Sequence, residues 1–213
     1  MKTVLCYGDS NTYGYNPENG LRYNEDERWT GILKSLLGPA YNVIEEGCNG
    51  RTTIYDDPTD NWLNGKYYLK PCLYSHKPVD IIILMLGSND LKNCFGASSR
   101  DIANGAGILA DIIKDFTLPG HGFIPEIILV SPPLIGPDIK NSPFNDAFDE
   151  TAISRSKEFK AEYSRVAEEK GCIFFDAAPY AIPSPLDSLH LTRESHKALA
   201  EAIYKKIAKI CQH

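Results

Sequence analysis

The sequence has no closely spaced pair of cysteines. Its six cysteines are scattered, and no two of them form C-x-x-C, the spacing typical of zinc sites and redox dithiols. Two of them lie in apolar runs, where cysteine behaves as a small hydrophobic residue. We therefore expect reduced thiols in a cytoplasmic protein. The five histidines include no i, i+4 pair of the kind that binds zinc in proteases, so we expect neither a metal nor another cofactor.

Long apolar runs and excess positive charge are also missing. The longest apolar run, residues 81–86, is far too short to span a bilayer, and no basic segment with a cleavage site precedes the first strand. The net charge is −6, whereas surfaces that bind nucleic acid or anionic membranes carry clustered lysine and arginine. We expect a small neutral or weakly polar molecule as the partner, and neither nucleic acid nor membrane.

Two well-known sequence signatures are absent as well. The G-x-S-x-G nucleophile elbow of α/β-hydrolases does not occur. Gly105 and Gly107 have neither the full G-x-G-x-x-G pattern nor a preceding strand, so they indicate close helix packing and not a phosphate-binding loop.

What is present is a regular alternation of strand-like and helix-like segments. The continuously apolar run at 79–86 is typical of a central strand covered on both faces. This order predicts a single domain over residues 1–213, an α/β protein whose five-stranded parallel sheet forms a three-layer α/β/α sandwich of flavodoxin type. The first expected strand begins at Val4, and the other four span 41–46, 79–86, 126–131 and 172–176. The expected helices span 28–37, 100–116, 148–170 and 193–210.

Residues 55–78 show no convincing period. The turn-favouring residues Asn64, Gly65 and Pro71 predict a long irregular loop with room for one short helix. Three carboxylates in this segment could suggest a cation site, but we interpret them as turn formers and helix caps. They are Asp56, Asp57 and Asp60.

Polar residues follow the first three strands, at the edge of the sheet where open α/β folds bind ligands. Ser10 follows the first strand and is placed like a nucleophile, although Asp9 and Ser10 could instead form a turn or cap a helix. Gly50 and Asn89 follow the next two strands. The Gly50 backbone amide and the Asn89 side-chain amide could stabilise an oxyanion, but taken singly each is more simply explained as a turn residue.

The last loop contains an aspartate three residues before a histidine. This spacing lets the Asp187 carboxylate hold Nδ1 of His190, so that Nε2 is free to take a proton from a serine. The alternative is that Asp187 caps the last helix and His190 is incidental.

Together these segments resemble the SGNH, or GDSL-type, hydrolase family. Its four sequence blocks occur in order as Gly8-Asp-Ser-Asn, the glycine of Gly50-Arg-Thr-Thr, Gly87-Ser-Asn-Asp and Asp187-Ser-Leu-His. Other segments, among them Arg28-Trp-Thr-Gly, are similar to the bacterial arylesterase/acyltransferase branch of that family. The resemblance implies an esterase fold and a serine mechanism.

The resemblance also implies the role of each site residue. The nucleophile would be Ser10, the base His190 and the residue that orients it Asp187, with the Ser10 amide, the Gly50 amide and the Asn89 side chain as the oxyanion hole. Substrate-binding positions would be Asn11, Tyr15 and Leu189. Three departures from the branch predict a more polar pocket and favour an acetylated sugar as substrate: Asn11 replaces a leucine, Tyr13 and Tyr15 replace tryptophans, and Gly50 replaces an alanine.

We therefore predict a serine esterase that hydrolyses small acetyl or aryl esters through an acyl-enzyme, with water or an alcohol as the acceptor. The alternatives are a carbohydrate O-deacetylase and a non-catalytic, flavodoxin-like module that binds a small ligand. The resemblance also points to a homo-oligomer, as do the apolar residues of the 55–78 segment. They are Trp62, Leu63, Tyr67, Tyr68 and Leu69.

Overall fold

The computed structural model describes residues 1–210, apart from the side chains of Asn61 and His121. Within this part of the chain, five parallel strands form one sheet in the order β2-β1-β3-β4-β5. The strands are β1 (Lys2–Gly8), β2 (Tyr41–Gly47), β3 (Ile81–Met85), β4 (Glu126–Ser131) and β5 (Ile173–Asp176). The predicted strands and their parallel arrangement are confirmed.

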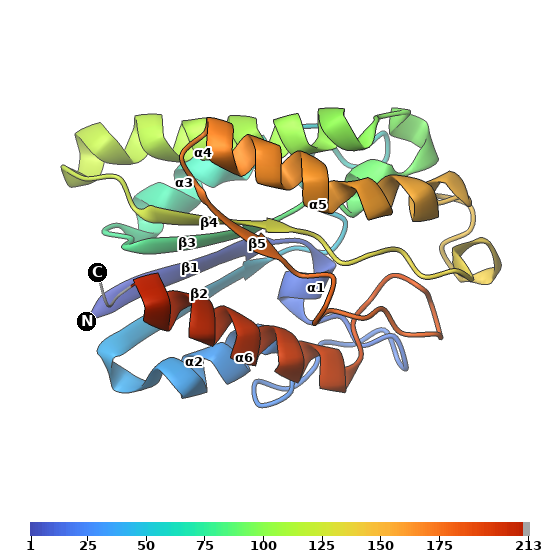
Figure 1. Ribbon diagram of the computed structural model, residues 1–213, viewed down its shortest axis with the longest axis horizontal. Coiled ribbons are helices and arrows are strands. Elements are labelled where there is room, and N and C mark those ends of the chain that lie inside the picture. Colours follow the sequence, from blue (N-terminus) through green and yellow to red (C-terminus); the bar gives the residue numbers. More distant parts are fainter. Residues whose placement is uncertain (211–213) are drawn as a thin grey trace.

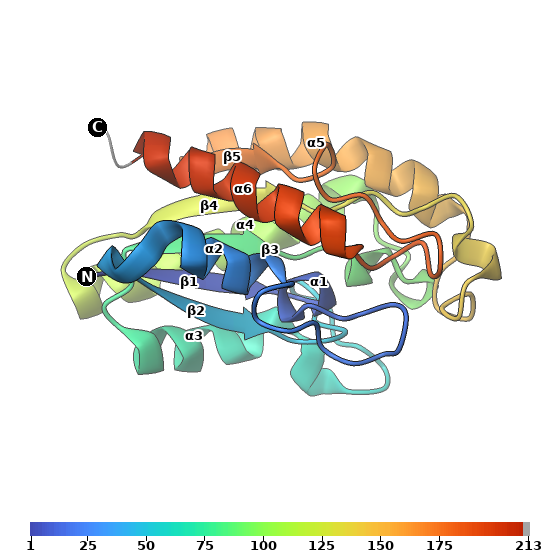
Figure 2. The same cartoon turned by 90° about the horizontal axis from the view of Figure 1, so that it is seen from below.

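Helices cover both faces of the sheet, which confirms the predicted three layers. Figures 1 and 2 show α3, α4 and α5 on one face and α2 and α6 on the other, with the short α1 next to the end of β1. The helices are α1 (Ser10–Tyr13), α2 (Trp29–Leu37), α3 (Gly65–His76), α4 (Ser99–His121), α5 (Thr151–Glu169) and α6 (Arg193–Ile210). No helix among the described residues is long and apolar enough to cross a membrane.

The side chains of each strand alternate between two hydrophobic cores. In β1, Leu5 and Tyr7 belong to the core beneath α3, α4 and α5, whereas Val4 and Cys6 belong to the core beneath α2 and α6. All four are fully buried. A strand covered on both faces must be apolar on both, which is why these strands are recognisable as continuous apolar runs.

The prediction of an irregular segment at 55–78 with room for one short helix is confirmed for residues 55–60 and wrong for the second half of the segment, which is a longer helix. α3 is a helix of 12 residues that contains Pro71 and begins after Asn64, whose side chain accepts a hydrogen bond from the amide of Lys66 at 3.0 Å. Asn64 is therefore a helix cap. Leu69 and Leu73 are fully buried on the inner side of α3, and this burial outweighs the backbone hydrogen bond that the proline cannot make.

The apolar residues of this segment divide into two groups. Leu63 and Leu69 are buried within the chain, so they are not available to a second subunit. Trp62, Tyr67 and Tyr68 are exposed. Of the five residues that favoured a homo-oligomer, only the three aromatic ones are therefore on the surface.

Two glycines allow α1 to lie close against the sheet. A Cβ added at Gly8 would come within 2.1 Å of Oγ1 of Thr12 and 2.7 Å of the carbonyl oxygen of Met85. A Cβ at Gly47 would come within 2.0 Å of the backbone nitrogen of Tyr13. Any side chain at these positions would displace α1, and with it Ser10.

Candidate active site

Ser10, His190 and Asp187 form a continuous hydrogen-bonded chain. Oγ of Ser10 lies 2.9 Å from Nε2 of His190, and Nδ1 of His190 lies 2.6 Å from Oδ2 of Asp187. All three residues are at least 94% buried. The two segments that carry them are distant in sequence and meet at the carboxyl edge of the sheet, as in other open α/β proteins.

The turn that carries His190 is held by its own aspartate. The other carboxylate oxygen of Asp187, Oδ1, accepts hydrogen bonds from the amides of Leu189 at 3.0 Å and His190 at 2.9 Å. Ser188 has a φ of 59°, in the left-handed region that non-glycine residues rarely adopt. Oγ1 of Thr192 accepts a hydrogen bond from the amide of Ser195 near the start of α6. Thr192 is therefore the cap of α6. The alternative role of Asp187, as the cap of the last helix, is filled by this threonine.

Ser10 is the first residue of α1. Asp9 caps this helix, because its Oδ1 accepts a hydrogen bond from the amide of Asn11 at 2.9 Å. The first amides of a helix have no carbonyl partner within the helix, so they can bind an anion. The Ser10 amide is thus available to a negatively charged oxygen next to its own hydroxyl.

The loops that carry Gly50 and Asn89 are joined at the same edge. The Asn89 side chain donates a hydrogen bond through Nδ2 to the carbonyl oxygen of Arg51 at 3.1 Å, which joins the loop after β3 to the loop after β2. Gly50 precedes that arginine and has a φ of 81°. Nη1 of Arg51 in turn donates to the carbonyl oxygen of Gly8 at 2.9 Å. The three loops that carry the predicted oxyanion donors are therefore linked.

Two buried aspartates lie beneath these loops. Burial raises the pKa of Asp9 to about 7 and that of Asp90 to about 6. The backbone amide of Thr53 donates to both carboxylate oxygens of Asp90, at 3.0 and 3.1 Å, and the Thr53 hydroxyl donates to one of them. These bonds lower the pKa of Asp90, but burial has the larger effect. Asp90 thus holds the loop after β2 against the loop that carries Asn89.

Two of the predicted substrate-binding residues are occupied within the chain. Asn11 is 2% exposed, and its side chain bonds to the backbone of Leu189 and Leu191. Leu189 is 5% exposed and belongs to the hydrophobic core beneath α4 and α5. Both side chains are therefore held within the chain, where they support the site and are not exposed to a substrate.

Tyr15 and Phe144 form an aromatic wall beside His190. The Tyr15 ring lies 4.1 Å from the imidazole between centroids, with the planes tilted by 34°, and Phe144 meets the imidazole edge-on at 5.3 Å. Sequence reasoning missed Phe144. The signal was weak, because this phenylalanine lies in the long loop after β4, where no periodic pattern predicts which way a side chain points.

One cluster outside this site has ligand atoms suited to a metal ion. Among the described residues, the ligand atoms of Glu46, Cys72 and His76 lie within 4.8 Å of one another. Glu46 is already paired with Nε2 of His76, at 2.7 Å. Burial raises the pKa of the Cys72 thiol to about 12, although the nearby positive charge of Arg51 lowers it in part. A cation would have to displace this pairing, so we assign no metal to the cluster.

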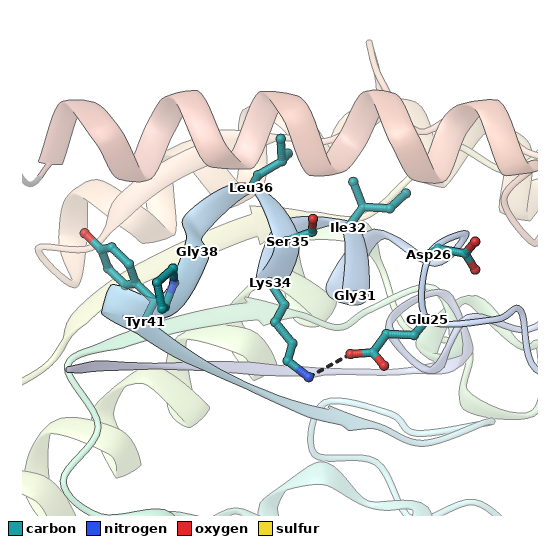
Figure 3. Close-up of a pocket in the computed structure, with 10 residues that line it drawn as sticks. Glu25, Asp26, Gly31, Ile32, Lys34, Ser35, Leu36, Gly38 and Tyr41 are labelled. Carbon is teal, nitrogen blue, oxygen red and sulfur yellow. Dashed lines mark hydrogen bonds and ion pairs between the residues drawn. The ribbon is translucent and has the colours of Figure 1, made fainter.

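A groove of about 730 Å³ lies along α2, away from Ser10 (Figure 3). It is lined by Ile32 and Leu36, and it includes the ion pair of Lys34 and Glu25 at 2.7 Å. The groove extends to Tyr41 at the start of β2. Its other end reaches Glu25 and Asp26, which precede α2, so the groove extends along the whole helix and does not include Ser10, Asp187 or His190.

This arrangement of fold and site defines a serine hydrolase of the SGNH type. The sequence pattern of the GDSL-like lipase/acylhydrolase family matches residues 6–198. The chain belongs to this family. Membership in a family of lipases and acylhydrolases supports an ester hydrolase over a non-catalytic binding module.

Solved structures support the same assignment. The carbohydrate acetylesterase Est24 from Sinorhizobium meliloti is 37% identical, with a TM-score of 0.91 over 99% of this chain and 100% of its own. The aryl esterase of M. smegmatis is 36% identical, with a TM-score of 0.91 over 98% of this chain and 99% of its own. A carbohydrate acetylesterase family member from S. meliloti is 34% identical, with a TM-score of 0.93 over 100% of both chains. No curated protein sequence matches the chain.

Proposed function

We propose that this protein hydrolyses small carboxylic esters, with Ser10 as nucleophile, His190 as general base and Asp187 as the residue that orients the base. The observation that carries the proposal is the pair of distances that joins the three side chains, 2.9 Å from Oγ to Nε2 and 2.6 Å from Nδ1 to Oδ2. A serine hydroxyl is a weak nucleophile unless an adjacent base accepts its proton. The short distance between Oγ of Ser10 and Nε2 of His190 supports this role for the histidine.

In the first step, Oγ of Ser10 attacks the ester carbonyl carbon while its proton passes to Nε2 of His190. The oxyanion that forms is stabilised by the amides of Ser10 and Gly50 and by Nδ2 of Asn89. The imidazolium then gives its proton to the departing alcohol, and the acyl group remains bound to Oγ of Ser10 as an acyl-enzyme. Water, deprotonated by His190, attacks the acyl group and releases the acid, and Ser10 recovers its proton.

We propose short acyl groups, acetyl above all, on a sugar or aryl alcohol. Support comes from the similarity to two carbohydrate acetylesterases and an aryl esterase. Tyr15 and Phe144 offer an aromatic wall against which either kind of alcohol can pack. The carbohydrate O-deacetylase is the second candidate function, and it is favoured by the acetylesterase similarity. Transfer of the acyl group to an alcohol in place of water follows from the same intermediate.

The test is hydrolysis of an aryl acetate and of an acetylated sugar by the wild type and by Ser10→Ala. We expect turnover of at least one substrate by the wild type and a loss of about 10⁶-fold in Ser10→Ala, by analogy with other serine triads. A higher kcat/KM for the acetylated sugar would favour the deacetylase. Full turnover by pure Ser10→Ala would contradict the proposal.

We also propose a cytoplasmic homo-oligomer in which each chain of 213 residues acts as one domain. Five cysteines of the described part are free, namely Cys6, Cys48, Cys72, Cys94 and Cys172, as is usual in a reducing compartment. The exposed aromatics Trp62, Tyr67 and Tyr68 favour an interface. Light scattering at micromolar concentration is expected to give a multiple of 23.7 kDa, and a monomer mass would contradict the oligomer.

A further inference from the structure

The side chain of Asn11 bonds to the backbone on both sides of His190. Its Nδ2 donates to the carbonyl oxygen of Leu189 at 3.4 Å, and its Oδ1 accepts from the amide of Leu191 at 3.1 Å. A carboxamide has a donor and an acceptor in one plane, so the Asn11 side chain can bind one carbonyl oxygen and one amide of the same turn. The residue between these two partners is the proposed base.

Asn11 is itself held rigidly. Its amide donates to Oδ1 of Asp9 at 2.9 Å, and its carbonyl oxygen accepts from the indole nitrogen of Trp29 at 3.0 Å. Trp29 is fully buried. The carboxamide thus projects from a backbone that is bonded on both sides, which makes it a firm support for the turn opposite.

The turn has other supports, but they come from residues outside α1. The amide of Gly136 donates to the carbonyl oxygen of Ser188 at 2.7 Å, and the amide of Ser184 donates to the carbonyl oxygen of His190 at 2.7 Å. Neither bond involves the helix that carries the nucleophile. Asn11, by contrast, follows Ser10 directly in α1, and its side chain bonds to the turn that carries His190.

We infer that Asn11 is a positioning residue that sets the distance between Ser10 and His190 by tying α1 to the turn at 187–191. This inference rests on the proposed function, and it replaces the expectation that Asn11 contacts substrate. Both polar atoms of its side chain are bonded within the chain, and the residue is 2% exposed. A leucine here would fill similar volume but would leave the Leu189 carbonyl and the Leu191 amide without this partner.

The experiment compares Asn11→Leu with the wild type in two assays. The first is the rate at which a fluorophosphonate labels Ser10, which reports on nucleophile activation without a choice of substrate. The second is kcat and KM for acetate and butyrate esters of one alcohol. We expect Asn11→Leu to slow labelling and to lower kcat by about 10- to 100-fold, equally for both esters, with KM nearly unchanged, because a small misplacement of catalytic groups has effects of this size.

The pH dependence of kcat/KM separates positioning from a general loss of stability. If the turn is loosened, the pH profile of kcat/KM is expected to differ between Asn11→Leu and the wild type, because the contacts of the imidazole with Asp187 and Ser10 change. Ser99→Ala is the matched control. It removes a buried hydroxyl whose single proton is shared between the carbonyl oxygen of Arg155 and the carboxylate of Glu158, but it touches neither Ser10 nor the turn. We expect it to lower the melting temperature without a change in labelling rate or pH profile.

The possible outcomes are distinct. If the wild type is not labelled at Ser10, the proposed function fails. If the wild type is labelled and Asn11→Leu is labelled at the same rate, the positioning role fails while the proposed function stands. A change in KM that differs between the two esters, with normal labelling, would return Asn11 to substrate binding. Should Asn11→Leu not fold, Asn11→Ser is the second variant, since its side chain is too short to reach both backbone groups, and the same criteria apply.

Discussion

The ring of Tyr15 lies against the imidazole of His190, with centroids 4.1 Å apart. An aromatic face stabilises a neighbouring cation, so this contact favours the imidazolium that forms during catalysis. We expect Tyr15→Ala to lower kcat by about 3- to 10-fold, which corresponds to about 0.7–1.4 kcal/mol. Tyr15→Phe keeps the ring and is expected to retain the wild-type rate. A raised KM with unchanged kcat in Tyr15→Ala would show that the ring serves substrate binding alone.

Replacement of Asp187 by Asn should disable the base while the turn stays folded. The asparagine retains an acceptor for the amides that Oδ1 now binds, but its NH₂ group would face Nδ1 of His190 and favour the wrong tautomer. We expect kcat to fall by as much as about 10⁴-fold, by analogy with other triads. Circular dichroism provides the control for folding. A normal rate in a folded variant would mean that Asp187 only shapes the turn.

For Asn89, catalysis and structure predict different losses. As an oxyanion donor, its side chain meets full negative charge only in the transition state, so Asn89→Ala should lower kcat by about 10²- to 10³-fold with KM nearly unchanged. As the partner of the Arg51 carbonyl, it should contribute about 1 kcal/mol to stability. Kinetics and melting temperature measured on the same preparation separate the two. A large drop in stability with near-normal kcat would exclude Asn89 from the oxyanion hole.

His196 predicts how stability depends on pH. The residue is fully buried, and burial, together with the charges of His190 and Arg28, lowers its pKa to about 3. Its Nδ1 accepts a hydrogen bond from the amide of Trp29 at 3.2 Å, and its Nε2 has no partner within the described part of the chain. Between pH 3 and pH 6.5 the unfolded chain therefore binds a proton that the folded chain does not. This histidine makes the protein less stable as the pH falls below about 6.5.

The effect is measured by comparison of the wild type with His196→Asn, whose Oδ1 can replace Nδ1 as the acceptor for Trp29. The raised pKa values of Asp9 and Asp90 act in the opposite direction, because their protons are lost from the folded state as the pH rises towards 7, but they cancel in the comparison. From pH 7.5 to pH 5.0, denaturant titrations should show that the wild type loses about 2 kcal/mol relative to the variant. If the free energies of unfolding of the wild type and His196→Asn changed equally with pH, His196 would not be neutral and buried.

The sheet could be predicted from sequence because its strands are apolar on both faces, as at Val4 and Leu5. α3 could not, because Asn64 and Pro71 are typical of turns, and only the packed structure shows that buried Leu69 and Leu73 outweigh them. Local signals of this kind predict an element well when propensity and burial agree, and poorly when they conflict.

The site divides in the same way. Asp187 and His190 are three residues apart, so their contact follows from a local pattern, and the family resemblance predicts that Ser10 joins them. The bonds of Asn11 depend on backbone groups at Leu189 and Leu191, which carry no sequence signature. A side-chain bond to backbone groups far away in the sequence leaves no motif, because any residue can supply the backbone partner.

The central claim is that Ser10 is a nucleophile activated by His190. Its most direct measurement is mass spectrometry of the intact protein and its peptides after treatment with a fluorophosphonate. The account predicts a single adduct, carried by the peptide that contains Ser10, which is absent in Ser10→Ala and forms much more slowly in His190→Ala. Labelling at another residue, or labelling of Ser10 at the same rate without His190, would contradict it.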